Sequence, residues 1–231
     1  MHVVVNQKLA RDRVRLASGF HFVALGVFAI GLWISWTQPE QILGSYAAIV
    51  VGLLLYNFGQ IFLRRWGPRF RQDRLLADAL KGLDNRYVLL AFASTKLPDY
   101  ILAGPGGLQV IVPRIHAGAI TCRGDRWRRE QGRGLGRFLT FLGGVPLGDP
   151  GQDVARGIQA VRERLQKRDW PDGSGPPIGG LVVFTNPEAK LRIDGCTRPV
   201  TKLRQLRNHI RGIKGTLNQQ AVNRLVEALR G

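Results

Sequence analysis

The feature that most constrains this chain is a pair of long apolar runs near its start. Residues 17–36 and 42–63 contain no Asp, Glu, Lys or Arg, and five residues separate them. Each run is about as long as a helix must be to cross the ~30 Å hydrocarbon layer of a bilayer. A buried helical hairpin of a soluble protein is the alternative, although two uncharged runs of this length are unusual there. The runs predict two transmembrane helices within residues 17–66.

The charges that flank the two runs predict their orientation. The segment between them carries only Glu40 as a charged residue. The basic residues on either side are Lys8, Arg11, Arg13 and Arg15 before the first run and Arg64, Arg65, Arg69, Arg71 and Arg74 after the second. Because positive charge is enriched in cytoplasmic segments, residues 1–16 and 67–231 are both expected in the cytoplasm. A cleaved signal peptide is disfavoured, since the first run is too long and no Ala-x-Ala site follows it.

The remaining charge lies outside the apolar runs and is strongly basic. The formal net charge is +18, and residues 67–231 contain 28 Lys or Arg against 14 Asp or Glu. Such a surface favours DNA, RNA or anionic lipid headgroups as partners. A merely solvated basic surface is the alternative. Within the second run, Asn57 and Gln60 lie on one helical face and can bond to the first helix or to another copy, so a homo-oligomer through the transmembrane helices is also open.

The cysteines and histidines give no metal pattern. Cys122 and Cys196 are far apart in sequence and belong to no CxxC or Cys/His cluster. They are expected to be packed, reduced thiols, without a zinc site or a disulfide framework. The four histidines are scattered and are interpreted as structural residues.

Residues 67–231 alternate between helical and strand patterns. Helices are predicted at 72–83, 152–167, 202–211 and 217–229, and strands at 87–93, 99–103, 108–113, 118–123, 180–185 and 189–193. The glycine-rich segment 131–151 is predicted to be a long loop or lid, and 170–177 a linker. This order predicts an α/β domain with a mixed sheet flanked by helices, preceded by the transmembrane hairpin.

Four segments of this domain resemble the nuclease-related (NERD) domain family, which has a restriction-endonuclease-like fold. They are DALKGLDNRYVLL at 78–90, PDYILAGPGGLQVIVPRIHAGAITCRGDRW at 98–127, DPGQDVARGIQAVRERL at 149–165 and GLVVFTNPEAKLRI at 180–193. The spacing from Asp99 to Gly118 is the most specific part of the resemblance. The resemblance and the flanking charges together predict an integral protein of a prokaryotic cell membrane.

The resemblance implies a nuclease site whose motif is incomplete in this chain. Nucleases of this fold hold Mg²⁺ or Mn²⁺ with carboxylates beside a lysine. Asp99 stands at the family aspartate, whereas Val112 replaces the second carboxylate and Arg114 the lysine. A valine cannot bind a metal, and arginine is suited to holding a phosphate rather than to moving a proton. No cofactor is therefore expected unless the chain is an active nuclease, in which case Asp99 is the candidate metal ligand and Asp99 and Arg114 the candidate catalytic residues.

Three functions remain open on these residues. The favoured one is a degenerate nuclease fold that binds nucleic acid or another polyanion at the membrane. The candidate binding residues are Arg114, Arg123, Arg126, Trp127, Arg128 and Arg129, with Trp127 available to stack on a base. The alternatives are a non-enzymatic interaction module for anionic lipid or a protein partner, and an active metal-dependent nuclease that recruits another carboxylate.

Overall fold

The computed structural model describes residues 1–38, 40–67, 71–130, 146–168 and 175–230. The chain divides into two compact units. One is formed by Asn6–Arg71, and the other combines Met1–Val5 with Gln72–Gly231. The second unit is therefore formed by residues that precede the first unit in sequence and residues that follow it.

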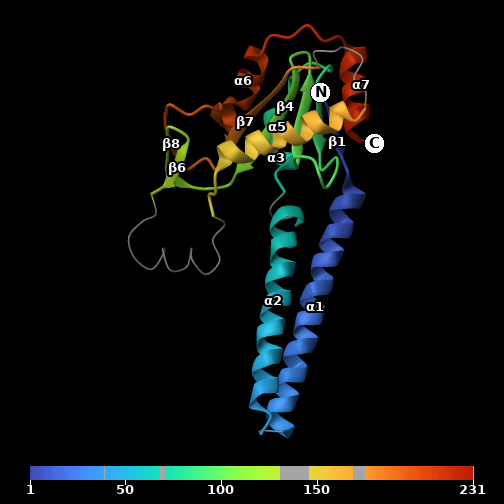
Figure 1. Cartoon of the computed structure of the whole chain (residues 1–231). Coiled ribbons are helices and arrows are strands. Elements are labelled where there is room, and N and C mark those ends of the chain that lie inside the picture. Colours follow the sequence, from blue (N-terminus) through green and yellow to red (C-terminus); the bar gives the residue numbers. More distant parts are fainter. Residues whose placement is uncertain (39, 68–70, 131–145, 169–174, 231) are drawn as a thin grey trace. The chain divides into compact units, whose positions relative to one another are not determined.

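The first unit is a helical hairpin of α1 (Gln7–Thr37) and α2 (Ile42–Trp66), which lie side by side (Figure 1). Both helices are long and apolar enough to cross a membrane. α1 begins ten residues before the predicted span, because the side chain of Asn6 caps it by accepting a hydrogen bond from the Leu9 N–H at 3.0 Å. The two predicted apolar helices are confirmed as a hairpin.

The second unit is built on a six-stranded mixed sheet. Its strands are β1 (His2–Val5), β2 (Val88–Ala91), β3 (Tyr100–Gly104), β4 (Gly107–Arg114), β7 (Ile178–Phe184) and β9 (Val200–Lys202). Their order in the sheet is β1-β2-β3-β4-β7-β9. β2, β3 and β4 form an antiparallel meander, and β7 joins β4 in parallel after a helical crossover. The predicted mixed α/β architecture is confirmed.

The edge strand β1 was not predicted. It pairs in parallel with β2, from His2 opposite Val88 to Val5 opposite Ala91. The segment expected to be only a basic N-terminal extension thus contributes a strand to the sheet, and α1 follows two residues later. Four residues are too few to give a strand pattern, and the partner strand lies beyond the hairpin in sequence.

Helices cover both faces of this sheet. α5 (Pro150–Gln166) and α7 (Gln219–Arg230) pack on one face, where their buried residues join a core with Ile101, Val110 and Val182. Figure 1 shows α5 running across the strands. α5 approaches closely because Gly157 lies against Val110, whose Cγ1 would be 2.8 Å from an added Cβ. α3 (Asp73–Ala79) and α6 (Leu206–Gly212) supply the further buried residues Leu76, Leu206 and Ile210, and Ile210 lines a small cavity with Leu102 of the sheet.

A separate three-stranded sheet follows the order β6-β5-β8. It consists of β5 (Gly118–Arg123), β6 (Arg126–Arg129) and β8 (Ala189–Asp194). β5 pairs antiparallel with β6 and parallel with β8. Its inner face, with Ile120 and Ala189 fully buried, joins the core of the main sheet. The sequence predicted β5 and β8 but treated β6 as a polar stretch.

The boundaries of the predicted helices also differ from those of the structure. The predicted helix at 72–83 ends at Ala79, and the one expected from 202 is preceded by β9 and a 3-10 turn, η1 (Leu203–Gln205). α5 begins two residues earlier than expected, because Asp149 caps it and Pro150 occupies its first turn. Most of the predicted loop at 131–151 and of the linker at 170–177 lies outside the described residues.

Candidate functional site

The position of the predicted nuclease motif is at the end of β4. Asp99 directly precedes β3, and its main-chain carbonyl accepts a hydrogen bond from the Phe92 N–H at 2.8 Å. Val112 pairs with Val182 and packs against the buried core. Among the residues that the structure describes, no group of three or more His, Cys, Asp or Glu side chains is placed to hold a metal ion.

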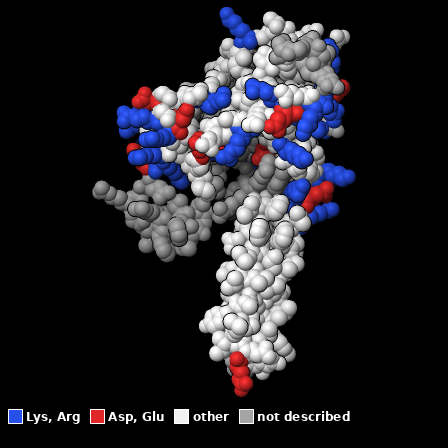
Figure 2. Space-filling view, in the orientation of Figure 1, with Lys and Arg blue, Asp and Glu red and all other residues white. Residues whose placement is uncertain are grey.

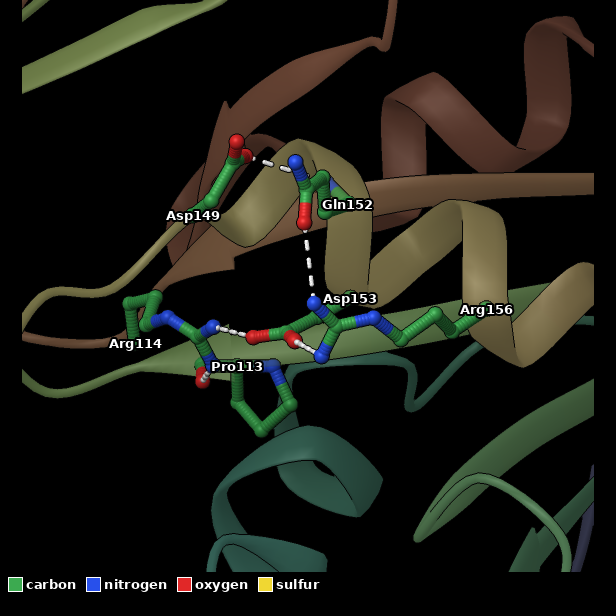
Figure 3. A network of polar contacts seen from close by, with 6 residues as sticks. All are labelled: Pro113, Arg114, Asp149, Gln152, Asp153 and Arg156. Atoms are coloured by element: carbon green, nitrogen blue, oxygen red, sulfur yellow. Dashed lines mark hydrogen bonds and ion pairs between the residues drawn. The ribbon is translucent and has the colours of Figure 1, made fainter.

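Arg114 ends β4 with its charge already paired. Its Nη2 forms an ion pair with Oδ2 of Asp153 on α5, and its Nη1 donates to the Pro113 carbonyl at 3.3 Å (Figure 3). Only 17% of the Arg114 side chain is exposed. Asp153 also lies 3.5 Å from Arg156, so one carboxylate serves two guanidinium groups. Arg114 therefore links β4 to α5 by an ion pair, and its positive charge is largely neutralised by Asp153 rather than available to a phosphate.

Trp127 and Arg129 lie on the inner side of the small sheet. The ring of Trp127 is partly buried against the core, with its centroid 6.1 Å from that of Phe184. Arg129 is half-buried and donates from Nε to the Ala117 carbonyl at 3.1 Å. Stacking of Trp127 on a base would need the ring to leave this packing. The six residues predicted as one binding set are thus divided among the end of β4 and the inner and outer sides of the small sheet.

The outer face of the small sheet carries a group of exposed cations, which we call the basic face. Its members are Arg123, Arg126, Arg128, Lys190 and Arg192. Figure 2 shows Lys and Arg gathered over the part of the molecule where Figure 1 labels β6 and β8. Lys190 and Arg192 were not predicted, although their alternation along the predicted strand places both on one side.

The register of the strands brings like charges together on the basic face. Arg123 lies directly opposite Arg126, while Arg128 and Arg192 flank Thr121 from the two neighbouring strands. Like charges facing each other across strands are destabilising unless an anion lies between them. The nearby acid is Asp194, whose Oδ2 is 3.4 Å from Nε of Arg123 with both side chains mostly exposed. An exposed pair of this kind neutralises little.

A tight turn between β5 and β6, and hydrogen bonds from that turn to Thr197, fix the conformation of the basic face. Gly124 and Asp125 have φ values of 51° and 61°, as a two-residue hairpin turn between β5 and β6 requires. The Asp125 carboxylate accepts hydrogen bonds from the hydroxyl and the main-chain N–H of Thr197, the latter at 2.8 Å. These bonds, with the Thr197 hydroxyl contributing most, hold the pKa of Asp125 below its usual value. The turn is thereby fixed to the segment after β8.

The two cysteines meet at the same end of the small sheet. Cys122 of β5 and Cys196 form a disulfide, with their Cα atoms 6.3 Å apart. The prediction of two separate thiols is wrong. Because β5 and β8 are parallel neighbours, the turn at Gly195 returns the chain beside β5 despite a separation of 74 residues.

Comparison of the chain with protein-family profiles, with characterised proteins and with solved structures finds no match.

Proposed function

We propose that this chain is a membrane-anchored protein whose cytoplasmic domain binds nucleic acid through the basic face without cleaving it. The observation that carries the proposal is the cross-strand register, which sets Arg123 against Arg126 and adds Arg128, Lys190 and Arg192 beside them. Guanidinium groups bind phosphate oxygens through paired hydrogen bonds, and a row of them suits a chain of phosphates.

The packing of Trp127 favours recognition of the backbone over recognition of bases. The outer side of β6 presents Arg126 and Arg128, whereas Trp127 points into the core. A flat basic surface without exposed aromatic rings contacts phosphates and does not stack on bases. The proposal is therefore sequence-independent, salt-sensitive binding, with double-stranded DNA as the first ligand to test.

Cleavage is not part of the proposal, because the positions that the nuclease-related family uses are occupied otherwise. The order α3, β2–β4, α5, β7 supports a degenerate restriction-endonuclease-like core. Val112 is partly buried against the hydrophobic core, and Arg114 is paired with Asp153. A metal-activated water needs at least one further carboxylate beside Asp99.

The pairing of β1 with β2 supports an anchor that crosses the membrane twice. β1 precedes the hairpin, β2 follows it, and both belong to one sheet. If the helices span a bilayer, the segments before α1 and after α2 must then lie on the same side, which needs an even number of crossings. The positive flanks favour the cytoplasm as that side.

The test uses the full chain, because a fragment starting after α2 would lack β1. The chain in nanodiscs of neutral phosphatidylcholine is titrated into fluorescein-labelled duplex DNA with Mg²⁺ or Mn²⁺, and anisotropy is followed at several salt concentrations. We expect binding whose affinity falls steeply with salt. Replacing Arg126, Arg128 and Arg192 with Gln should make the slope of log K against log[salt] shallower by about 3.

A matched control variant removes three positive charges outside the basic face. Three other exposed arginines, Arg162, Arg168 and Arg204, are replaced with Gln, and this variant should keep the slope of the parent chain. An equal loss in both variants would show that net charge alone attracts DNA. A metal-dependent fall of anisotropy below that of free DNA would show cleavage and contradict the proposal. Binding to phosphatidylglycerol nanodiscs but not to DNA would identify anionic lipid as the ligand instead.

A further inference from the structure

The inner face of the helical hairpin is closely packed through glycine. At three positions of the hairpin, an added Cβ would lie within 2.7 Å of an atom on the facing helix. These contacts pair Gly31 with Ala48, Gly52 with Phe28 and Gly59 with His21. Small residues let two helices approach closely in a membrane, where burial of apolar surface gives no driving force. This face of α2 is therefore filled by α1.

Polar side chains of the two helices bond to one another on that inner face. Nδ1 of His21 donates to the Ala17 carbonyl at 2.8 Å, which leaves Nε2 as an acceptor. The Gln60 amide nitrogen lies 3.3 Å from this Nε2 and also donates to the Tyr56 hydroxyl at 3.0 Å. Gln60 thus reaches α1 through its amide nitrogen, whereas the hydrogen bond of Asn57, the other amide in α2, stays within its own helix.

Asn57 lies on the opposite, exposed side of α2. Its Nδ2 donates to the Leu53 carbonyl of its own helix at 2.7 Å, and within the described residues its Oδ1 has no hydrogen-bond partner. Asn57 is six residues before Leu63, which ends the apolar run, and therefore about 9 Å along the helix from that end. At this depth no water is present to bond the amide, and an unsatisfied amide in hydrocarbon is costly.

We propose that a second copy of this chain covers this side of α2, with Asn57 of each copy bonded to Asn57 of the other. An amide carries both a donor and an acceptor, so two of them related by a two-fold axis satisfy each other. The exposed residues in line with Asn57 form a seam at spacings of four and three, consisting of Tyr46, Val50, Leu53, Asn57 and Ile61. One polar residue in an apolar seam fixes the register of a helix pair. The inference rests on the membrane location proposed above.

The test measures energy transfer between full-length chains in phosphatidylcholine vesicles. Two populations carry donor or acceptor dyes at the C-terminus, and the vesicles are diluted with lipid to obtain the dissociation constant of the dimer. We expect Asn57→Leu to raise this constant about 3- to 20-fold, the range measured for polar contacts between membrane helices. Asn57→Gln should restore most of the association, because it keeps the amide.

Two controls make the result specific to the seam. Phe58→Leu changes an exposed residue beside the seam and should leave the dissociation constant unchanged. Val50→Cys should cross-link under mild oxidation, whereas Val51→Cys, one residue off the seam and similarly exposed, should not.

Separate outcomes distinguish failure of the seam from failure of the anchor. Equal dissociation constants for the parent chain and Asn57→Leu, or no energy transfer at any density, would overturn the seam alone. Release of the chain from vesicles by alkaline carbonate would overturn the anchor and the seam together.

Discussion

The two sheets of this protein use their residues in opposite ways. In the main sheet, every residue of β2 and β3 is buried, because α5 and α7 cover one face and other helices cover the opposite face. In the small sheet, buried residues alternate with partly exposed ones along the middle of β5, and along β6 the exposed Arg126 and Arg128 alternate with half-buried residues. Of the two sheets, in the residues that the structure describes, the small one therefore carries the row of exposed basic side chains.

The residues that stabilise the fold are therefore different from those proposed to bind nucleic acid. Val112 and Arg114 lie on β4 of the main sheet, where Val112 packs against the core and Arg114 is paired with Asp153. The exposed cations of the basic face lie on the small sheet. Core packing and the charged surface therefore depend on different residues.

The largest expected effect comes from the buried sheet. Ile101 is fully buried in the centre of the core, so Ile101→Ala should lower the free energy of unfolding by about 2–5 kcal/mol. The matching change on the basic face, Arg192→Ala, should stay within about 0.5 kcal/mol. Urea unfolding in detergent micelles, followed by circular dichroism, measures both. Similar decreases in the free energy of unfolding of the two variants would contradict the view that the main sheet carries the stability and the small sheet does not.

The disulfide should be the second largest contributor. Reducing the Cys122–Cys196 bond frees a segment of 74 residues in the unfolded chain and should lower stability by about 2–4 kcal/mol. Unfolding with and without dithiothreitol measures the loss, and a Cys122→Ser, Cys196→Ser variant should be insensitive to the reductant. A reductant effect in that variant would assign the loss to something other than this bond.

The state of the same bond in the cell tests the orientation of the domain. Disulfides are rare in the reducing cytoplasm. If the domain lies in the cytoplasm as proposed, the pair that the structure shows bonded should be kept reduced in the cell. A thiol-alkylating reagent added at lysis should then trap Cys122 and Cys196 as free thiols, which form the bond of the structure only after oxidation. Quantitative bonding in the cell would place the domain on the opposite side of the membrane from that proposed.

The ion pair between the sheet and α5 should have a smaller effect. Asp153→Ala leaves Arg114 partly buried without its carboxylate and should destabilise the domain by about 1–2 kcal/mol, reduced by the exposure of Asp153. Replacing Arg114 and Asp153 together with Leu should recover most of this loss and leave the net charge unchanged. The DNA affinity of the double variant should match that of the parent chain. A lower DNA affinity would show that Arg114 takes part in binding after all.

The smallest effect is the pH dependence of the turn at Asp125. Its pKa is lowered from 3.8 in the folded state, so its contribution to stability is present above that value and is lost as the pH falls through the folded pKa. The unfolding midpoints of the parent chain and of Thr197→Val should differ at neutral pH and converge at strongly acidic pH. A constant difference would mean that Thr197 acts through packing alone.

Much of the fold could be predicted because its signals are local. The hairpin, the meander, α5 and β7 follow from apolar runs and glycine turns within a few residues. β6 was missed because its four residues, Arg126–Arg129, are mostly charged, although the preceding Gly124-Asp125 is a typical hairpin turn. β1 and the disulfide were missed because their partners lie 86 and 74 residues away.

The candidate site was predicted in part. Arg123, Arg126 and Arg128 do lie on one open face, as a charged cluster suggested. Trp127 and Arg129 were grouped with them because adjacency in sequence hides the alternation of a strand, which sends every second side chain inward. Arg192 joins the face only through the parallel pairing of β8 with β5, a contact that the sequence does not signal.

The position of β1 has a consequence for how the protein is made. On the ribosome, His2 emerges 86 residues before Val88, the residue it pairs with. At typical synthesis rates of 5–20 residues per second, this strand waits roughly 4–17 s without its neighbour. Both helices of the hairpin are produced during that interval. The sheet can therefore close only after the hairpin has been synthesised. If the hairpin spans a bilayer as proposed, a helix inserted the wrong way would leave β1 on the far side of the bilayer from β2.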